Sequence, residues 1–175
     1  FIKNMKNHYI VDAGNLLFKK EILEPGISGE VALINAEIIL ESFNTMGCHA
    51  FSLGEKDFSA GKNFILEAYE NTQFPFISCN IYDLNDKLLF DPYVIYESKG
   101  MKIAFIGLSS IFISEGISVK DPIESLKAVL DEITPKTDVR ILLFSSTNQD
   151  MQKLQAENLD LSMIVRSKNK QKSLD

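Results

Sequence analysis

Side chains that could hold a hard metal ion lie in loops that each follow an apolar stretch of the chain. Asp12 and Asn15 follow the first stretch, and Glu55 and Asp57 follow a later one. A hard cation needs several oxygen ligands that converge from separate loops. These four side chains could supply part of such a site, but the same residue types also serve as loop caps and solvated charges. The residues alone leave both interpretations open.

A second set of polar residues follows the last apolar stretches, and it comprises Ser145, Ser146, Thr147, Arg166, Lys168 and Lys170. The ammonium group of Lys56, joined by Lys168 or Lys170, could attract an anion such as phosphate. The competing interpretation is that these lysines only form surface ion pairs with Glu55 and Asp57. Both alternatives predict a polar edge where the loops meet.

The composition excludes several classes of protein. The 175 residues include 18 Lys and Arg against 24 Asp and Glu, which gives a net charge of −6 and argues against binding to a nucleic-acid polymer. Two cysteines cannot form a disulfide framework or a four-thiolate zinc site, and two histidines leave little room for an imidazole-based metal centre. No apolar stretch approaches the roughly 18 residues of a membrane span.

The elements that must position these loops alternate between strands and helices. Short apolar runs predict strands, and periodic apolar positions predict helices. Because the alternation is typical of parallel strands covered by helices, we expect an α/β fold with functional loops at the carboxyl ends of the strands. The predicted strands are 8–12, 48–53, 74–79, 93–97, 101–108, 139–144 and 161–165, and the predicted helices are 29–46, 61–72, 121–133 and 148–157.

Local signals fix three boundaries. Gly47 lies where a glycine favours the end of a helix, and Asp121-Pro122 is a strong helix start with Glu124 as its acidic partner. The tripeptide Ser98-Lys99-Gly100 is typical of a hairpin turn, which makes the sheet mixed. Cys48 and Cys79 fall at opposite strand ends, so we expect no disulfide between them. His8 and His49 lie near strand starts, where a structural role is expected.

The loops and strands, taken in order, resemble one family. The matching pieces are Asp12-Ala13-Gly14-Asn15, Asn44-Thr45-Met46-Gly47-Cys48-His49-Ala50, Leu53-Gly54-Glu55-Lys56-Asp57-Phe58-Ser59-Ala60-Gly61, Phe74-Pro75-Phe76-Ile77-Ser78-Cys79-Asn80-Ile81, Gly100-Met101-Lys102-Ile103-Ala104-Phe105-Ile106-Gly107-Leu108 and Asp138-Val139-Arg140-Ile141-Leu142-Leu143-Phe144-Ser145. Their order and spacing over residues 9–170 are similar to the calcineurin-like metallophosphoesterase domain of the 5′-nucleotidases. The resemblance implies an α/β sandwich of two mixed β-sheets flanked by helices, in four layers. It also implies a single partial domain over 1–175, truncated at both ends and without the C-terminal substrate domain.

The departures from the family pattern fall on its metal and catalytic positions. The resemblance implies two divalent metals that activate a water and clamp the phosphate. Asn15 stands where the family has a metal-bridging aspartate, and Glu55 stands at an asparagine ligand position. Lys56 occupies the position of the catalytic histidine, and Ser145, or Ser146 if the alignment shifts by one residue, occupies that of a histidine ligand. By a looser match, Lys168 and Lys170 replace the last histidine pair.

Three functions remain open. The first is a non-catalytic homologue that keeps the scaffold and binds an anion, such as phosphate or a nucleotide, or a partner. It needs no cofactor, and Asn15 and Glu55 are its only metal-ligand candidates. The alternative is a phosphomonoester (nucleotide) hydrolase that uses Mn, Zn or Fe, with ligands outside this chain or a reduced site on Asp12, Asn15, Glu55 and Asp57. The third is an interaction module of a longer chain. The resemblance implies a periplasmic or cell-surface location.

Overall fold

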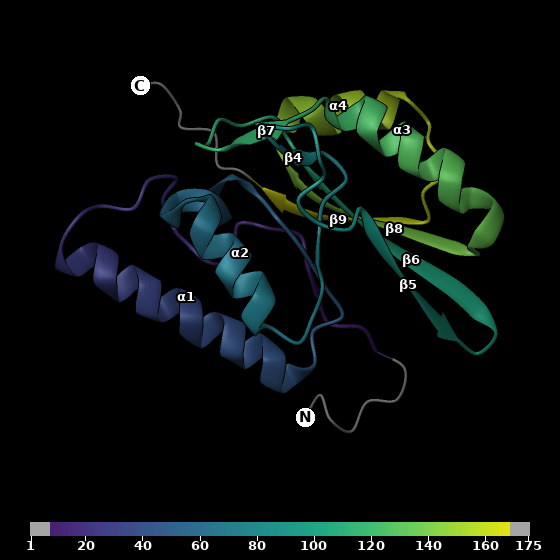
Figure 1. Ribbon diagram of the computed structural model, residues 1–175. Helices are drawn as coiled ribbons and strands as arrows, with labels where there is room; N and C mark the ends of the chain where they lie inside the picture. Colours follow the sequence, from purple (N-terminus) through teal and green to yellow (C-terminus); the bar gives the residue numbers. More distant parts are fainter. Residues whose placement is uncertain (1–7, 169–175) are drawn as a thin grey trace.

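The first half of the chain forms a small parallel sheet with two helices on one side. The computed structural model describes residues 8–168 (Figure 1). The sheet has the order β1-β2-β3 with all pairs parallel. The elements are β1 (Val11–Asp12), α1 (Ile27–Met46), β2 (Ala50–Ser52), the 3-10 helix η2 (Glu55–Ala60), α2 (Lys62–Asn71) and β3 (Phe76–Ile77).

The second half forms a mixed sheet of order β5-β6-β8-β9, in which β5 and β6 are antiparallel and the other pairs are parallel. A two-stranded antiparallel ribbon, β4 with β7, lies beside it. The elements are β4 (Ile81–Asp83), β5 (Tyr93–Ser98), β6 (Met101–Ser109), β7 (Ile117–Val119), α3 (Pro122–Ile133), η3 (Thr134–Lys136), β8 (Val139–Ser146), α4 (Asn148–Ala156) and β9 (Met163–Lys168).

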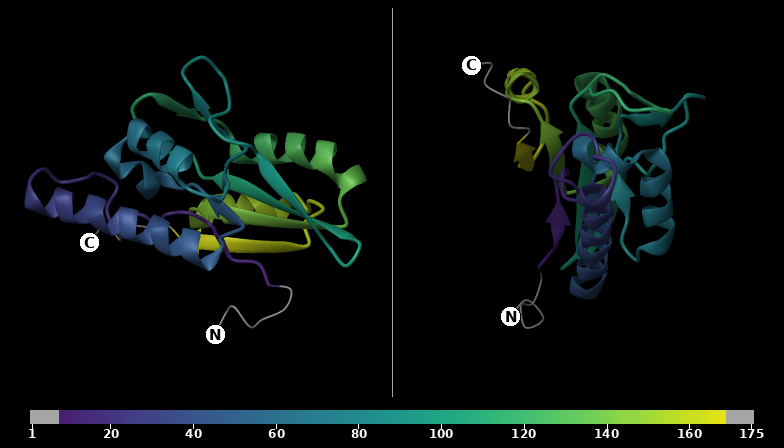
Figure 2. Two further views of the ribbon diagram at one scale, coloured as in Figure 1. Left: turned by 60° about the horizontal axis from the view of Figure 1, so that its bottom comes forward. Right: turned by 90° about the vertical axis from the view of Figure 1, so that its left-hand side faces the viewer.

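The two sheets pack face to face between two helical layers, as Figures 1 and 2 show. Buried apolar side chains fill the space between the sheets, among them Ala50, Phe105 and Leu143. At Gly107 the sheets approach so closely that a Cβ atom would collide with the carbonyl group of Ile77. Helices α1 and α2 cover the first sheet, and α3 and α4 cover the second. The expected four-layer α/β sandwich is therefore confirmed, although the three described strands of the first sheet are parallel rather than mixed.

The local signals in the sequence correspond to observed geometry. The Asp121 carboxylate caps α3 by accepting hydrogen bonds from the N–H groups of Ile123 at 2.9 Å and Glu124 at 3.0 Å. Gly47 ends α1 in the left-handed conformation, with φ of 75°. Both turn residues of the hairpin, Lys99 and Gly100, have positive φ, which matches the twist of the strands they join.

Several predicted boundaries were wrong. The first strand begins at Val11 because the Ile10 N–H donates to the His49 imidazole instead of a neighbouring strand carbonyl. The ribbon β4/β7 and the 3-10 helix η2 were not predicted, since their residues lack a sustained apolar period. On α1, Met46 near the C-terminal end is 40% exposed. Cys48 and Cys79 are both free and buried, as expected.

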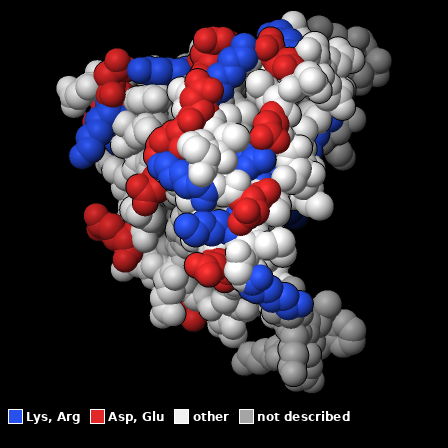
Figure 3. Space-filling view, turned by 90° about the vertical axis from the view of Figure 1, so that its right-hand side faces the viewer, with Lys and Arg blue, Asp and Glu red and all other residues white. Residues whose placement is uncertain are grey.

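Charges on one face of the molecule are mixed rather than segregated. On the side at the right of Figure 1, acidic and basic side chains alternate (Figure 3). The ion pairs among residues 8–168 include Glu132 with Lys136 and Arg140 with Asp160. No helix within residues 8–168 is long and apolar enough to cross a membrane.

Candidate functional site

The loops at the carboxyl ends of β1, β2, β8 and β9 meet at one end of the sandwich. The parallel register of the second sheet aligns Ser109, Ser145 and Ser167 in one row across β6, β8 and β9. From β9, the Ser167 hydroxyl donates to the Ala13 carbonyl oxygen at 3.0 Å, which ties the second sheet to the loop after β1. The row of serines therefore forms one wall of the candidate site.

A fully buried carboxylate, Asp57, holds the two loops of the first sheet together. Its Oδ2 accepts the N–H groups of Asn15 at 2.7 Å and Gly54 at 2.9 Å, and its Oδ1 accepts that of Leu17 at 2.9 Å. Burial raises the pKa of Asp57 to about 6, against the opposing influence of these three N–H groups. The charge of nearby Asp12 adds to the rise. Asp57 thus fixes the loops in place.

The side chain of Asn15 crosses the centre of the site. Its Nδ2 donates to Ser145 Oγ at 2.8 Å and contacts Ser167 Oγ at 3.5 Å. Its Oδ1 accepts the Lys56 backbone N–H at 2.9 Å. The backbone of Asn15 has φ of 60°, a left-handed conformation that asparagine tolerates better than most residues. One neutral amide therefore joins loops from both sheets by direct hydrogen bonds.

The space around this amide is filled by the chain itself. A Cβ atom at Gly54 would collide with Ser145 Oγ and lie 2.7 Å from Asn15 Oδ1. A Cβ atom at Gly14, which has φ of 98°, would lie 2.9 Å from the backbone nitrogen of Gly54. Both glycines are needed because the two loops approach more closely than any side chain permits.

The remaining carboxylates lie around this centre. Asp12 Oδ1 accepts the Gly14 N–H at 2.7 Å, and burial raises the pKa of Asp12. Glu55 is half-buried, and both burial and the neighbouring Glu21 raise its pKa, whereas Lys56 lowers it. Glu55 therefore has an acidic neighbour, Glu21, and a basic neighbour, Lys56.

A groove with a volume of about 940 Å³ opens beside the site and runs along α1. Its polar lining residues are Asn15, Lys19, Lys20, Glu24, Ser28, Asn35, Lys56, Ser59 and Ser167, and Lys20 forms an ion pair with Glu24. Lys168 ends β9, but its side chain lies outside the described part of the structure, and Lys170 lies outside the described residues. Of the predicted cations, Lys56 is thus the one that the structure places at the groove.

The donor set does not fit the two divalent metals that the resemblance implies. Across residues 8–168, no three His, Cys, Asp or Glu side chains gather where they could hold a metal ion. Asn15, at the bridging position, uses its amide to join Ser145 and Lys56. A bridging ligand needs a carboxylate, whose two oxygens and negative charge can hold two dications together, and a neutral amide supplies neither. No metal-dependent step is therefore derived for these residues.

Sequence reasoning missed Ser167, which contacts both Asn15 and Ala13. The signal was present, because Ser109, Ser145 and Ser167 each stand near the end of an apolar run. To predict that Ser167, and not Lys168, faces Asn15, one must know the exact register of β9 against β8. That register depends on pairing between distant segments.

Comparisons with known proteins agree on one family. No family model matches the chain. The 5′-nucleotidase of Vibrio cholerae is 34% identical over 116 residues, which cover 61% of this chain and 21% of that relative. The chain thus spans about a fifth of the length of this curated relative.

Solved structures reproduce the fold. A 5′-nucleotidase described as putative, from Staphylococcus aureus, matches 90% of this chain with a TM-score of 0.75 at 15% identity, and this chain covers 35% of it. The calcineurin-like phosphoesterase YfkN from Bacillus subtilis also matches 90%, with a TM-score of 0.74 at 19% identity, and this chain covers 57% of it. Sequence similarity and fold together identify the chain as a metallophosphoesterase domain of the 5′-nucleotidase type.

Proposed function

We propose that this domain is a non-catalytic homologue of the 5′-nucleotidase metallophosphoesterases, which keeps the scaffold and a ligand groove but not the metal centre. The observation that carries this proposal is the direct bonding of Asn15 to Ser145 and Lys56 at the centre of the site. Hydrogen bonds within the chain hold the loops of this site together, as metal ions do in the family. A metal-dependent nucleotide hydrolase is the alternative that the first experiment tests.

The first experiment measures metal content and turnover of the purified full-length protein, because the hydrolase alternative allows metal ligands outside these 175 residues. We expect substoichiometric Mn, Zn and Fe by mass spectrometry. We also expect hydrolysis of p-nitrophenyl phosphate and nucleoside monophosphates, with each metal added, to equal that of the Asp12→Asn variant. Stoichiometric metal together with turnover that Asp12→Asn abolishes would support the hydrolase and end this proposal.

A second experiment returns the bridging carboxylate through Asn15→Asp. The variant loses the donation to Ser145 Oγ and gains a negative charge beside Asp12 and Asp57, so its free energy of unfolding should fall by about 1–3 kcal/mol. Adding Mn²⁺ should leave this loss unchanged, as measured by urea unfolding with and without the metal. Full rescue by Mn²⁺ would show that the remaining ligands can still hold a metal.

The groove supports an anionic ligand as part of the same proposal. Lys19 and Lys56 line it together with hydroxyl groups and the Lys20–Glu24 ion pair, and its apolar wall could contact a base or another flat group. Titration calorimetry with inorganic phosphate and with a nucleoside monophosphate tests this, and the Lys56→Gln variant is compared with the unchanged chain. Weakened binding in that variant is expected, and no binding at millimolar ligand removes the anion from the proposal.

An exported location also belongs to this proposal, on the grounds of the family resemblance alone. Cell fractionation of the full-length protein in its own host would test it. Recovery with the cytoplasmic fraction would contradict it.

A further inference from the structure

Helix α1 carries a row of exposed apolar side chains on the side away from the sheet. Ile27 is 80% exposed, Val31 50%, Ile34 55% and Ile38 58%. The opposite side of the same helix is buried through Gly29, Ala36 and Leu40. The helix lies at the outside of the molecule in Figure 1 and in the left view of Figure 2. An exposed apolar row of this kind marks an interaction surface.

The spacing of this row is that of a helix–helix seam. The four residues follow one another at intervals of four, three and four, which is the a/d repeat of two heptads. Val31 and Ile38 occupy the a positions, and Ile27 and Ile34 occupy the d positions. A second helix laid along α1 would therefore bury all four side chains at once. We call these four residues the α1 seam.

One flank of the α1 seam is acidic and lacks counter-charges. Glu30 and Glu37 stand at the g positions beside the seam, and α1 contains no Lys or Arg. None of the ion pairs among residues 8–168 includes either glutamate. The other flank presents Ser28 and Asn35, which are neutral and line the groove of the candidate site together with Lys19, Lys20 and Lys56.

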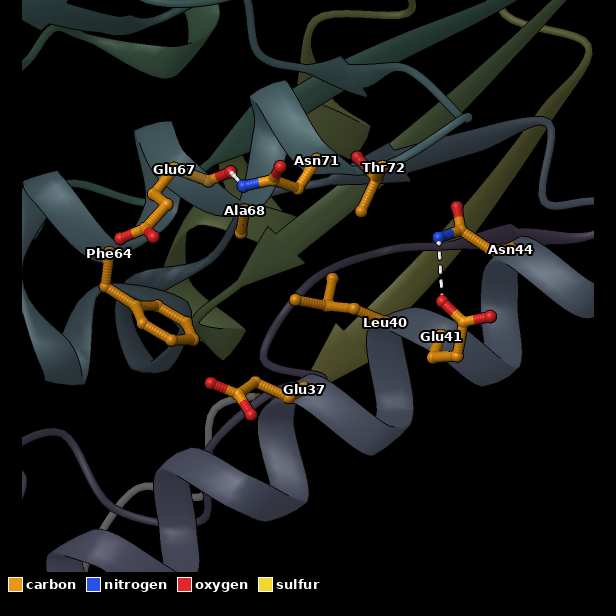
Figure 4. A pocket seen from close by; sticks show the side chains of 9 residues that line it. All are labelled: Glu37, Leu40, Glu41, Asn44, Phe64, Glu67, Ala68, Asn71 and Thr72. Carbon is orange, nitrogen blue, oxygen red and sulfur yellow. Dashed lines mark hydrogen bonds between the residues drawn. The ribbon is translucent and has the colours of Figure 1, made fainter.

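The acidic flank continues into a cleft of about 290 Å³ between α1 and α2. Figure 4 shows Glu37 and Glu41 from α1 and Glu67 from α2 around this cleft, with Leu40 and Phe64 between them. Glu41 accepts a hydrogen bond from Asn44 at 3.4 Å. Long cationic side chains that crossed the seam could reach these carboxylates.

A second copy of this chain does not match these charges. Its α1 would bring no cation, and an antiparallel pair would place Glu30 of one copy against Glu37 of the other. Like charges that face each other across a helix pair oppose association. The occupant that fits must bring positive charge to the g flank.

We propose that the α1 seam binds an amphipathic helix of a partner protein, whose apolar stripe has a/d spacing and whose flank carries lysine or arginine against Glu30 and Glu37. Apolar contact with the seam supplies the attraction, and the paired charges set the choice of partner. The proposal does not depend on whether the site at the strand ends is catalytic.

The test uses two synthetic three-heptad peptides with the 175-residue chain. Both carry isoleucine at a and leucine at d, and they differ only in having lysine or glutamate at every e and g position. These like charges keep each peptide from pairing with itself. We expect the lysine peptide to bind at least about tenfold tighter by fluorescence anisotropy. The variant Glu30→Lys/Glu37→Lys should reverse that preference.

Two further variants distinguish binding at the α1 seam from non-specific hydrophobic binding. Ile34→Glu should abolish binding, and it should fold normally because the side chain is exposed. Leu84→Glu is the matched control, because Leu84 is 74% exposed but lies far from α1 in sequence, beside β4. Equal binding of the two peptides, or no binding of either, overturns the proposal. A dimer of the chain in sedimentation velocity that Ile34→Glu dissociates would also overturn it, in favour of a second copy.

Discussion

The outer helices of the two halves, α1 and α3, differ in how many of their large apolar side chains are buried. Every large apolar side chain of α3 is buried, its first turn is capped by Asp121, and Lys127 pairs with Glu157 at the end of α4. By contrast, α1 has no side-chain cap and leaves five large apolar residues exposed, namely Met46 and the four residues of the α1 seam. The difference teaches that the apolar side chains of α3 are buried by residues 8–168, whereas one side of α1 stays exposed within the same residues.

The largest test of this contrast compares one truncation on each helix. Leu126→Ala removes a fully buried side chain of α3 and should lower the free energy of unfolding by about 2–5 kcal/mol. Ile34→Ala on α1 should change it by less than about 0.5 kcal/mol, because the side chain is exposed and alanine favours helix. Urea unfolding of both variants measures the difference. Equal losses would mean that the α1 seam is part of the domain's own core.

The loops at the ends of the two sheets also differ. Those of the first sheet are joined by the buried carboxylate of Asp57. Because the pKa of Asp57 is about 6 when folded and 3.8 at its ordinary value, the folded chain holds this proton more tightly than the unfolded chain. The contribution of Asp57 to stability should therefore be greatest below about pH 4. It should decline by about 3 kcal/mol as the pH rises to about 6, and stay constant above that.

Asp57→Asn should remove this part of the pH dependence. Urea unfolding of the variant and the unchanged chain from pH 4 to pH 7 gives the comparison. An identical slope in both would show that Asp57 does not titrate in this range.

A smaller effect is expected where the two sheets meet at the site. Gly54→Ala places a methyl group against Ser145 Oγ and should cost about 1–3 kcal/mol of unfolding free energy. In the double variant Gly54→Ala/Ser145→Ala the hydroxyl is absent, so part of that cost should be recovered. A double-variant cycle by urea unfolding measures the coupling. Strict additivity would mean that the loops move apart freely.

The smallest effect concerns the helix caps. Asp121→Ala removes the cap of α3 and should cost about 1 kcal/mol, whereas Asp121→Asn should cost little because asparagine also caps well. Thermal unfolding of the pair resolves this difference. If both variants behaved alike, the cap would not contribute to the stability of α3.

Local chemistry made part of the fold predictable. The cap at Asp121, the end of α1 at Gly47 and the hairpin turn at Lys99 depend on neighbouring residues, and they agree with the structure. The contact of Asn15 with Ser145 joins residues 130 positions apart, so no local pattern contains it. The resemblance placed these two residues at one site, but their direct bond depends on how the sheets pack.

The close approach of Gly54 to Ser145 also constrains how the domain can change. An imidazole at position 145 needs more room than a hydroxymethyl group, and even one methyl group at Gly54 would occupy the gap. The loop that contains Gly54 is joined to the loop after β1, because Asp57 accepts the N–H groups of Asn15 and Leu17. A histidine could therefore be accommodated at position 145 only if at least one neighbouring residue changed at the same time.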